Sequence, residues 1–135
     1  MKIGQASRKG LYFTRYYEWI DFQGAIAYTG IGAFKLLGFK EVHEIVFGEL
    51  SGFKNCGDLI ATIRYKDYRV KACMPVDGKI LKLNDVLFTG NQKILLQYPE
   101  TSGWIALISP SRPYDRNGLL LPKEYQMGGK IRHTK

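Results

Sequence analysis

The sequence predicts a mostly β domain built from two small antiparallel sheets. Short apolar runs alternate with polar residues, turn-forming residues separate these runs, and no linker or low-complexity tract divides the chain. With 135 residues the chain suits one domain, large enough to bury a core without disulfides. Its 45% hydrophobic and 24% charged residues are typical of folded proteins rather than disordered ones.

The first third of the chain predicts two strands, a short helix and a third strand. Residues 11–22 alternate as one strand does, residues 25–29 form a second, and Gln23 and Gly24 supply the hairpin turn between them. Residues 32–39 have the pattern of a short amphipathic helix that faces inward through Phe34, Leu37 and Leu36. Residues 42–50 return to strand.

The segment 57–78 predicts a hairpin followed by a corner. If Lys66 and Asp67 are the two turn residues, alternation places Ile63, Tyr65, Tyr68 and Val70 on one face and Arg64, Arg69 and Lys71 on the other. Tyr65 then lies opposite Tyr68, and Ile63 opposite Val70. Asp67 suits a turn because its short side chain bonds to nearby backbone.

The remaining segments follow the same logic. Asp77 and Gly78 give a two-residue turn signal before a strand at 79–83, residues 84–91 are turn-rich with one helical turn, and 94–96 and 104–108 are apolar, strand-like runs. Residues 109–118 form a loop, and a short helix begins at Pro122. We expect one domain over residues 1–127 and a basic tail over 128–135. The expected core residues are Trp19, Ile60, Ile63, Val70, Ile80, Leu83, Trp104, Ile105 and Leu107.

Nothing in the sequence predicts an enzyme, a metal site or a membrane protein. Cys56 and Cys73 are far apart and form no CxxC pair, so we expect reduced packing cysteines, and with His43 and His133 they lack zinc-ligand spacing. No catalytic motif is present, and His43 is expected to pack or to face solvent. No apolar run reaches the ~20 residues of a membrane span, so a cytoplasmic protein is the default.

Several motifs follow one another in an order that is typical of a known protein family. FTRYYEW at 13–19 is similar to an opening YTxxHEW, with Tyr17 in place of histidine, and EIVFGEL at 44–50 is similar to DIVFVEL. Further matches are Gly30, Ile31 and Phe34 to GITDFA, Gly57, Pro75 and Gly78 to a hairpin unit, Pro99, Gly103 and Trp104 to PYGxGW, and Leu120, Glu124 and Tyr125 to a C-terminal helix. In this order the motifs resemble the glycine cleavage system H protein family of lipoyl carriers.

The resemblance implies a barrel-sandwich hybrid, or hammerhead, with a C-terminal helix. It also implies a carrier whose hairpin lysine holds a covalent lipoyl group, which takes an aminomethyl group from glycine decarboxylase to an aminomethyltransferase and is reoxidised by a dihydrolipoyl dehydrogenase. Without gaps, the position of that lysine falls on Asp67, with Lys66 one residue earlier. Arg64 and Tyr65 occupy the place where the family usually has acidic residues.

Three functions therefore remain open. The first is a protein without a cofactor that binds glycine cleavage or lipoate-linked enzymes, with Arg64, Tyr65, Tyr68 and Arg69 as docking residues. The second is a working carrier that holds lipoate on Lys66. The third is binding of anions or nucleic acid by the basic hairpin 64–71, because the chain has a net charge of +8 whereas the family is generally acidic.

Overall fold

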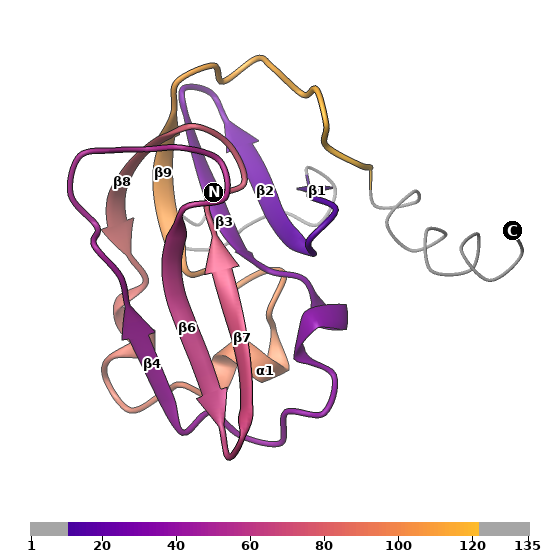
Figure 1. The fold of residues 1–135 in the computed structure, drawn as a ribbon, viewed down its shortest axis with the longest axis vertical. Coiled ribbons are helices and arrows are strands. Elements are labelled where there is room, and N and C mark those ends of the chain that lie inside the picture. Colours follow the sequence, from indigo (N-terminus) through magenta and orange to yellow (C-terminus); the bar gives the residue numbers. More distant parts are fainter. Residues whose placement is uncertain (1–10, 122–135) are drawn as a thin grey trace, which may run out of the picture.

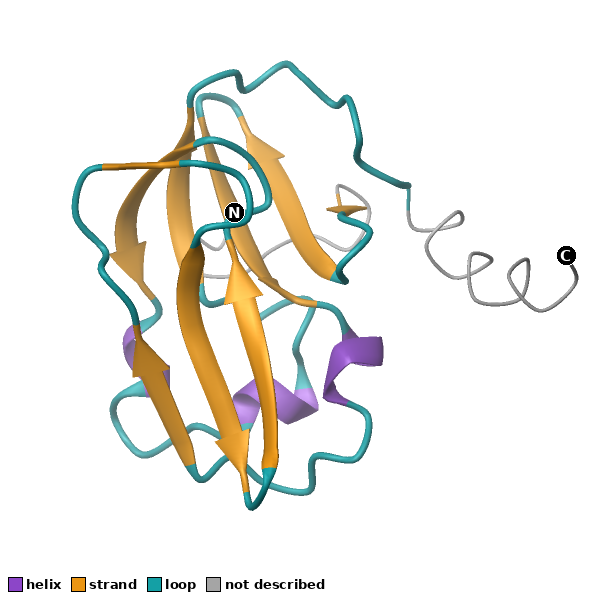
Figure 2. Ribbon diagram, viewed as in Figure 1, coloured by secondary structure: helices purple, strands orange, loops and turns teal. Residues whose placement is uncertain are grey.

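The computed structural model describes residues 11–121 and has the mostly β architecture, with two antiparallel sheets, that the sequence predicts (Figures 1 and 2). A six-stranded sheet has the order β1 (Leu11–Phe13), β2 (Glu18–Gln23), β3 (Ile26–Ile31), β9 (Ala106–Pro110), β8 (Gly78–Leu83) and β5 (Phe53–Lys54). A three-stranded sheet has the order β4 (Glu44–Phe47), β6 (Leu59–Tyr65) and β7 (Tyr68–Cys73). Between residues 11 and 121 the helical segments are the 3-10 helices η2 (Ala33–Leu36) and η3 (Asp85–Leu87) and the short helix α1 (Ile94–Gln97).

The predicted single strand over residues 11–22 is wrong, because the chain turns back on itself between Thr14 and Glu18. The amide of Thr14 donates to the carbonyl of Glu18 over 2.8 Å, and Tyr17 adopts a left-handed conformation with φ 70°. The Thr14 hydroxyl donates to the Glu18 carboxylate over 2.7 Å, which stabilises the turn. As a result β1 and β2 are two paired strands rather than one.

The next turn is displaced by one residue. Gln23 pairs with Ile26, so Gly24 and Ala25 are the turn residues rather than Gln23 and Gly24. Gly24 has φ 69°, a conformation that glycine adopts without steric cost. The sequence pattern correctly predicted a turn that contains Gly24, but it placed the glycine second in the turn instead of first.

The expected helix over residues 32–39 is reduced to the four residues of η2. Leu36 is 7% exposed and packs against the core, whereas Phe34 and Leu37 are 44% and 74% exposed, so their predicted inward orientation is wrong. Gly38 follows with φ 93°, which a continuing helix does not allow. One turn of 3-10 helix is too short to present a full apolar face.

Two further predictions fail in the second half of the chain. Residues 94–96 lie in α1 instead of a strand, because the Tyr98 amide donates to the Ile94 carbonyl in a local helical bond. Asp77 and Gly78 are not a hairpin turn, because β7 and β8 belong to different sheets and Gly78 already lies in β8. Glycine is needed there for close packing, since a Cβ atom would lie 2.9 Å from the Cα of Pro110.

Several other segments match the prediction. The strand predicted over 79–83 is β8, the helical turn predicted within 84–91 is η3, and the run at 104–108 forms most of β9.

Leu120, expected in a C-terminal helix, instead exchanges two 2.7 Å backbone hydrogen bonds with Phe13. The helix predicted from Pro122, with Glu124 and Tyr125, and the tail at 128–135 lie outside the described residues.

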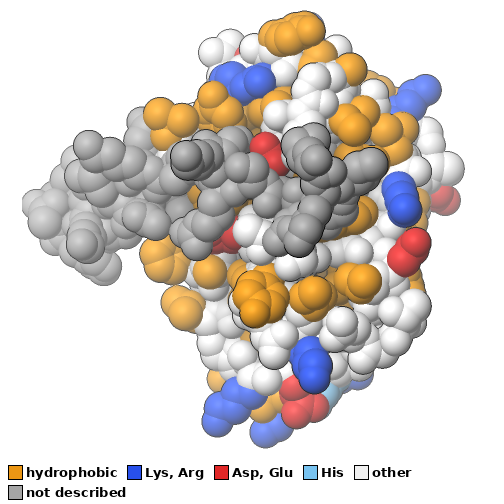
Figure 3. Space-filling view, turned by 180° about the vertical axis from the view of Figure 1, so that it is seen from behind, with side chains coloured by type: hydrophobic (Ala, Val, Ile, Leu, Met, Phe, Trp, Pro, Cys, Tyr) orange, Lys and Arg blue, Asp and Glu red, His pale blue; other side chains and the backbone are white. Residues whose placement is uncertain are grey.

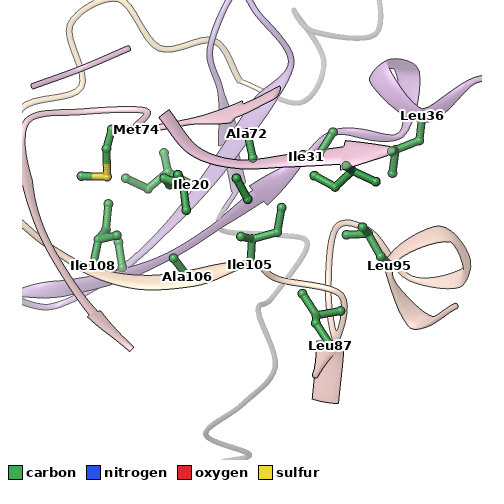
Figure 4. Packing of buried hydrophobic residues seen from close by; sticks show 14 residues of the cluster. Ile20, Ile31, Leu36, Ala72, Met74, Leu87, Leu95, Ile105, Ala106 and Ile108 are labelled. Atoms are coloured by element: carbon green, nitrogen blue, oxygen red, sulfur yellow. The ribbon is translucent and has the colours of Figure 1, made fainter. Parts of the chain in front are cut away.

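The main core lies between the two sheets and is closed at one end by the helical segments (Figure 4). Ile60, Ile63 and Ile105 are at most 1% exposed, as predicted, while Val70, Ile80 and Leu83 are partly buried against this cluster. A second cluster contains both tryptophans, with Trp19 0% and Trp104 5% exposed. Leu107 packs against this second cluster instead of the first.

Candidate functional site

The hairpin of β6 and β7 has the predicted register. Tyr65 pairs with Tyr68, Ile63 pairs with Val70, and Lys66 and Asp67 form the exposed turn between the strands. Lys66 has φ 54°, in the left-handed region that residues other than glycine adopt infrequently. We use the name hairpin tip for residues 64–69.

His43, just before β4, holds the hairpin tip in place. Its Nδ1 accepts a hydrogen bond from the amide of Lys66 over 3.2 Å, and its own amide donates to the carbonyl of Arg64 over 2.8 Å. The imidazole also lies edge-on to the Tyr65 ring, with 5.0 Å between centroids. The Nζ of Lys66 lies 5.3 Å from the centroid of the same ring. This role was missed from the sequence, because a contact over 23 positions leaves no local pattern.

The four predicted docking residues differ in accessibility. Tyr65 is only 6% exposed, whereas its stacked neighbour Tyr68 is 55% exposed. Arg64 forms an ion pair with Glu44, with 3.0 Å between Nε and Oε1. Arg69 is exposed and has no carboxylate partner among residues 11–121. Tyr68 and Arg69 are therefore the docking candidates best placed to meet a partner.

A cleft of about 900 Å³ lies beside β7, the outer strand of the front sheet in Figure 1. Its walls are formed by β7 and the residues after it, by the turn between β1 and β2, by Lys35, by Cys56 and Gly57, and by residues 117–119. The lining includes Arg15, Glu18, Lys35, Cys56, Arg69, Val70, Lys71, Cys73, Met74 and Leu119. Sequence reasoning did not predict this cleft, because its walls come from five separate parts of the chain.

Glu18 is a fully bonded carboxylate in the wall of the cleft. Its side chain is 3% exposed and lies 2.8 Å from the Nζ of Lys35. It also accepts from the Thr14 hydroxyl over 2.7 Å and from the Cys73 amide over 3.4 Å. Glu18 is the one carboxylate that the described part of the chain contributes to the lining, and Lys35 neutralises it, so the cleft keeps the charges of Arg15, Arg69 and Lys71.

Both cysteines are free and line the cleft. Desolvation, with a smaller effect of Glu18, raises the pKa of the Cys73 thiol. Desolvation, and to a smaller extent the negative charge of Asp77, raises the pKa of the Cys56 thiol. The Sγ atom of Cys56 lies 3.4 Å from the Pro75 carbonyl oxygen. Cys56 is exposed, contrary to the expectation that both cysteines pack in the interior. Both thiols are protonated at neutral pH and are therefore weak nucleophiles.

The back face of the molecule carries a mixture of side chains where described residues are visible. On the face opposite the three-stranded sheet, hydrophobic side chains lie between scattered Lys, Arg and acidic residues (Figure 3). Among residues 11–121, no three His, Cys, Asp or Glu side chains converge as a metal site would require. No helix in that range has the length and apolar character needed to cross a bilayer.

Comparisons with known proteins identify relatives of this chain in sequence and in structure. No family model matches the chain. It is 28% identical over 116 residues to a glycine cleavage system H protein of Alkaliphilus oremlandii, covering 86% of this chain and 90% of the relative. It is 28% identical over 121 residues to one from Carboxydothermus hydrogenoformans, covering 87% and 90%.

A solved structure agrees. The crystal structure of a glycine cleavage system H protein from Mycobacterium marinum superposes with a TM-score of 0.75 at 17% identity, covering 91% of this chain and 98% of that one. The sequence matches extend over nearly the whole length of the bacterial relatives, and the structural match extends over most of this chain. The chain is therefore homologous to the glycine cleavage system H proteins and shares their fold.

Proposed function

We propose that this chain is an H-protein-like interaction protein that carries no lipoyl group at the usual position. The observation behind this proposal is the pair Lys66 and Asp67 at the hairpin turn. Attachment of lipoate forms an amide between its carboxyl group and an amine, and the Asp67 side chain ends in a carboxylate. Without gaps, the hairpin sequence aligns Asp67 with the family's lysine.

The surroundings of Lys66 support the same proposal. Its amide is bonded to His43, its backbone is left-handed, and its Nζ lies over the Tyr65 ring. A lipoyl arm works by reaching outward from the tip, whereas this side chain lies along the hairpin. Arg64, paired with Glu44, replaces the acidic residue that precedes the lysine in the family. Docking to glycine cleavage or lipoate-linked enzymes would then depend on the shared fold rather than on a carried group.

One specific observation favours a second candidate, a carrier that holds lipoate on Lys66. The Lys66 side chain is exposed, so its amine is accessible to a lipoylating enzyme. A third candidate, nucleic-acid binding by residues 64–71, depends on the exposed Tyr68 and on Arg69 and Lys71, two exposed cations that form no ion pair with a residue between 11 and 121. It is weakened by the burial of Tyr65, which leaves one tyrosine to stack on bases.

Intact mass separates the first two candidates. The full chain is co-expressed with a lipoate ligase and lipoate, and a lipoylated H protein expressed in parallel serves as the positive control. We expect the mass of the unmodified chain. A lipoyl adduct that disappears in the Lys66→Arg variant, which keeps the charge but lacks an amine that forms this amide, would contradict the proposal and establish the second candidate.

A further inference from the structure

We infer that the free edge of β7, together with the cleft beside it, binds an extended acidic segment of a partner protein as an added strand. This inference rests on the proposed function, because it specifies how an interaction protein with this fold would hold its partner. The observations behind it are the position of β7 in its sheet, the direction of its backbone groups, and the charge of the cleft.

β7 is an edge strand whose free side faces the cleft. The three-stranded sheet has the order β4, β6, β7, and no strand among residues 11–121 pairs with β7 on its outer side. An unpaired strand edge presents a row of amide and carbonyl groups that another chain can pair with. Proteins commonly cover such an edge, whereas here β7 borders an open cleft of about 900 Å³.

The register identifies which backbone groups are free. In a hairpin with a two-residue turn, the residues that flank the turn form a hydrogen-bonded pair, and every second pair after them does the same. Tyr68 and Val70 therefore bond to β6, and the amides and carbonyls of Arg69 and Lys71 point outward. Cys73 follows the same alternation, and its outward amide donates to the Glu18 carboxylate. Glu18 thus shows that an acceptor can reach this edge.

The side chains define the partner's chemistry. Arg69 and Lys71 lie on one face of β7, Arg15 lies on the opposite wall of the cleft, and none of the three has a carboxylate partner within residues 11–121. Val70, Met74 and Leu119 line the same cleft with apolar side chains. A strand paired with β7 alternates its side chains across the two faces. The fitting segment therefore alternates acidic residues, next to Arg69 and Lys71, with apolar residues next to Val70.

Peptide binding to the full chain tests this inference. The probe is an acetylated eight-residue peptide that alternates Glu and Val. The first comparison peptide replaces Glu by Lys, and the second carries N-methyl groups on alternate amides, which removes half of its donors. We expect the Glu peptide to bind at least about tenfold more tightly than either, since one contrast tests charge and the other tests backbone pairing. We also expect it to slow hydrogen exchange at the amides of Arg69 and Lys71.

Matched variants locate the site. Lys71→Pro removes both the outward amide and the charge, whereas Lys71→Thr removes the charge alone, so weaker binding to the Pro variant than to the Thr variant isolates the backbone bond. Proline is tolerated at an edge position whose amide faces outward. Arg69→Gln with Lys71→Gln should weaken binding about tenfold, while Lys79→Gln with Lys93→Gln, exposed cations outside the cleft, should leave it unchanged. The glutamine pair still tests the inference if the proline variant does not fold.

Three results would overturn the inference: equal binding of the N-methylated peptide, exchange protection elsewhere on the surface, and tighter binding of single-stranded oligo(dT) than of the acidic peptide. The protein used is first weighed intact. A lipoyl adduct on Lys66 would therefore refute the proposed function without affecting this test, which measures pairing along β7.

Discussion

The ring of His43 accepts a hydrogen bond from the amide of Lys66, with 3.2 Å between Nδ1 and N. This contact joins the segment before β4 to the turn of the β6–β7 hairpin. Because the same imidazole packs against Tyr65, one side chain fixes both the backbone of the turn and the ring beneath it. The geometry requires Nδ1 to be the unprotonated nitrogen, since an acceptor carries no proton.

Replacing His43 by alanine should loosen the hairpin tip. The lost hydrogen bond, together with the lost ring contact, should lower the free energy of unfolding by about 1 to 2 kcal/mol and speed hydrogen exchange at the Lys66 amide. Urea denaturation and exchange measured by NMR give both quantities. Glu41→Gln is the control, because Glu41 contacts the other ring nitrogen at the surface and should matter by less than about 0.5 kcal/mol. If the rate of hydrogen exchange at the Lys66 amide is unchanged in the alanine variant, the hairpin tip keeps its conformation without His43.

The register of the β6–β7 hairpin could be predicted from the sequence, and the cleft could not. Alternation places Tyr65 opposite Tyr68 because a two-residue turn leaves only one register for the strands. The break at Thr14 escaped prediction because it depends on hydrogen bonds with Glu18 that an apolar pattern does not reveal. Residues 94–96 were predicted as a strand because a short apolar run fits a helix equally well.

In the candidate site, too, the local features could be predicted and the contacts between distant segments could not. The turn residues Lys66 and Asp67 were found from local chemistry, since they lie in one continuous segment. The contact with His43 and the grouping of Arg15 with Arg69 in the cleft join segments distant in sequence. Such groupings depend on how the two sheets pack, which composition and alternation do not specify.

Gly30 is required by its neighbour Trp19. The two residues pair across β2 and β3, and a Cβ atom on Gly30 would lie 2.8 Å from the indole ring, which also donates to the Pro99 carbonyl over 2.8 Å. Gly30→Ala should therefore lower stability by about 1 to 3 kcal/mol, the usual cost of overpacking a core. Gly48→Ala is the control, because its Cβ would meet neighbours at 3.4 Å or more. Equal denaturation midpoints for the two variants would show that the indole moves aside freely.

Thiol ionisation should make the protein less stable in alkali. Desolvation raises the pKa of Cys73 above the roughly 8.5 of an exposed thiol, so the folded state holds the proton more tightly than the unfolded state. The stability that this tighter proton binding contributes is fully present below the thiol pKa of the unfolded state and is lost as pH rises through the thiol pKa of the folded state. The urea midpoint should thus fall above about pH 8.5. Cys73→Ser should flatten this part of the profile, and an identical slope in the variant would exclude the thiol as its cause.

The last prediction concerns exchange of the turn residues. A lysine at position 67 should permit lipoylation if the scaffold is otherwise that of an H protein, but the residue at 66 must tolerate φ 54°. Asparagine does so better than a β-branched residue, so we choose Lys66→Asn with Asp67→Lys and co-express the variant with lipoate ligase and lipoate. We expect a small fraction of lipoylated protein by intact mass, because Arg64 stands where the family has an acidic residue.

Adding Arg64→Glu should raise that fraction, provided that the new carboxylate does not face Glu44, which now lies 3.0 Å from the Arg64 Nε. Glu44→Gln is therefore included in the same variant. Its matched control carries Glu44→Gln and the exchanged turn but keeps Arg64. If no variant is modified while each retains the unfolding midpoint of the parent, then the barrier to lipoylation lies beyond residues 64–67, and Asp67 is not what prevents lipoylation of this chain.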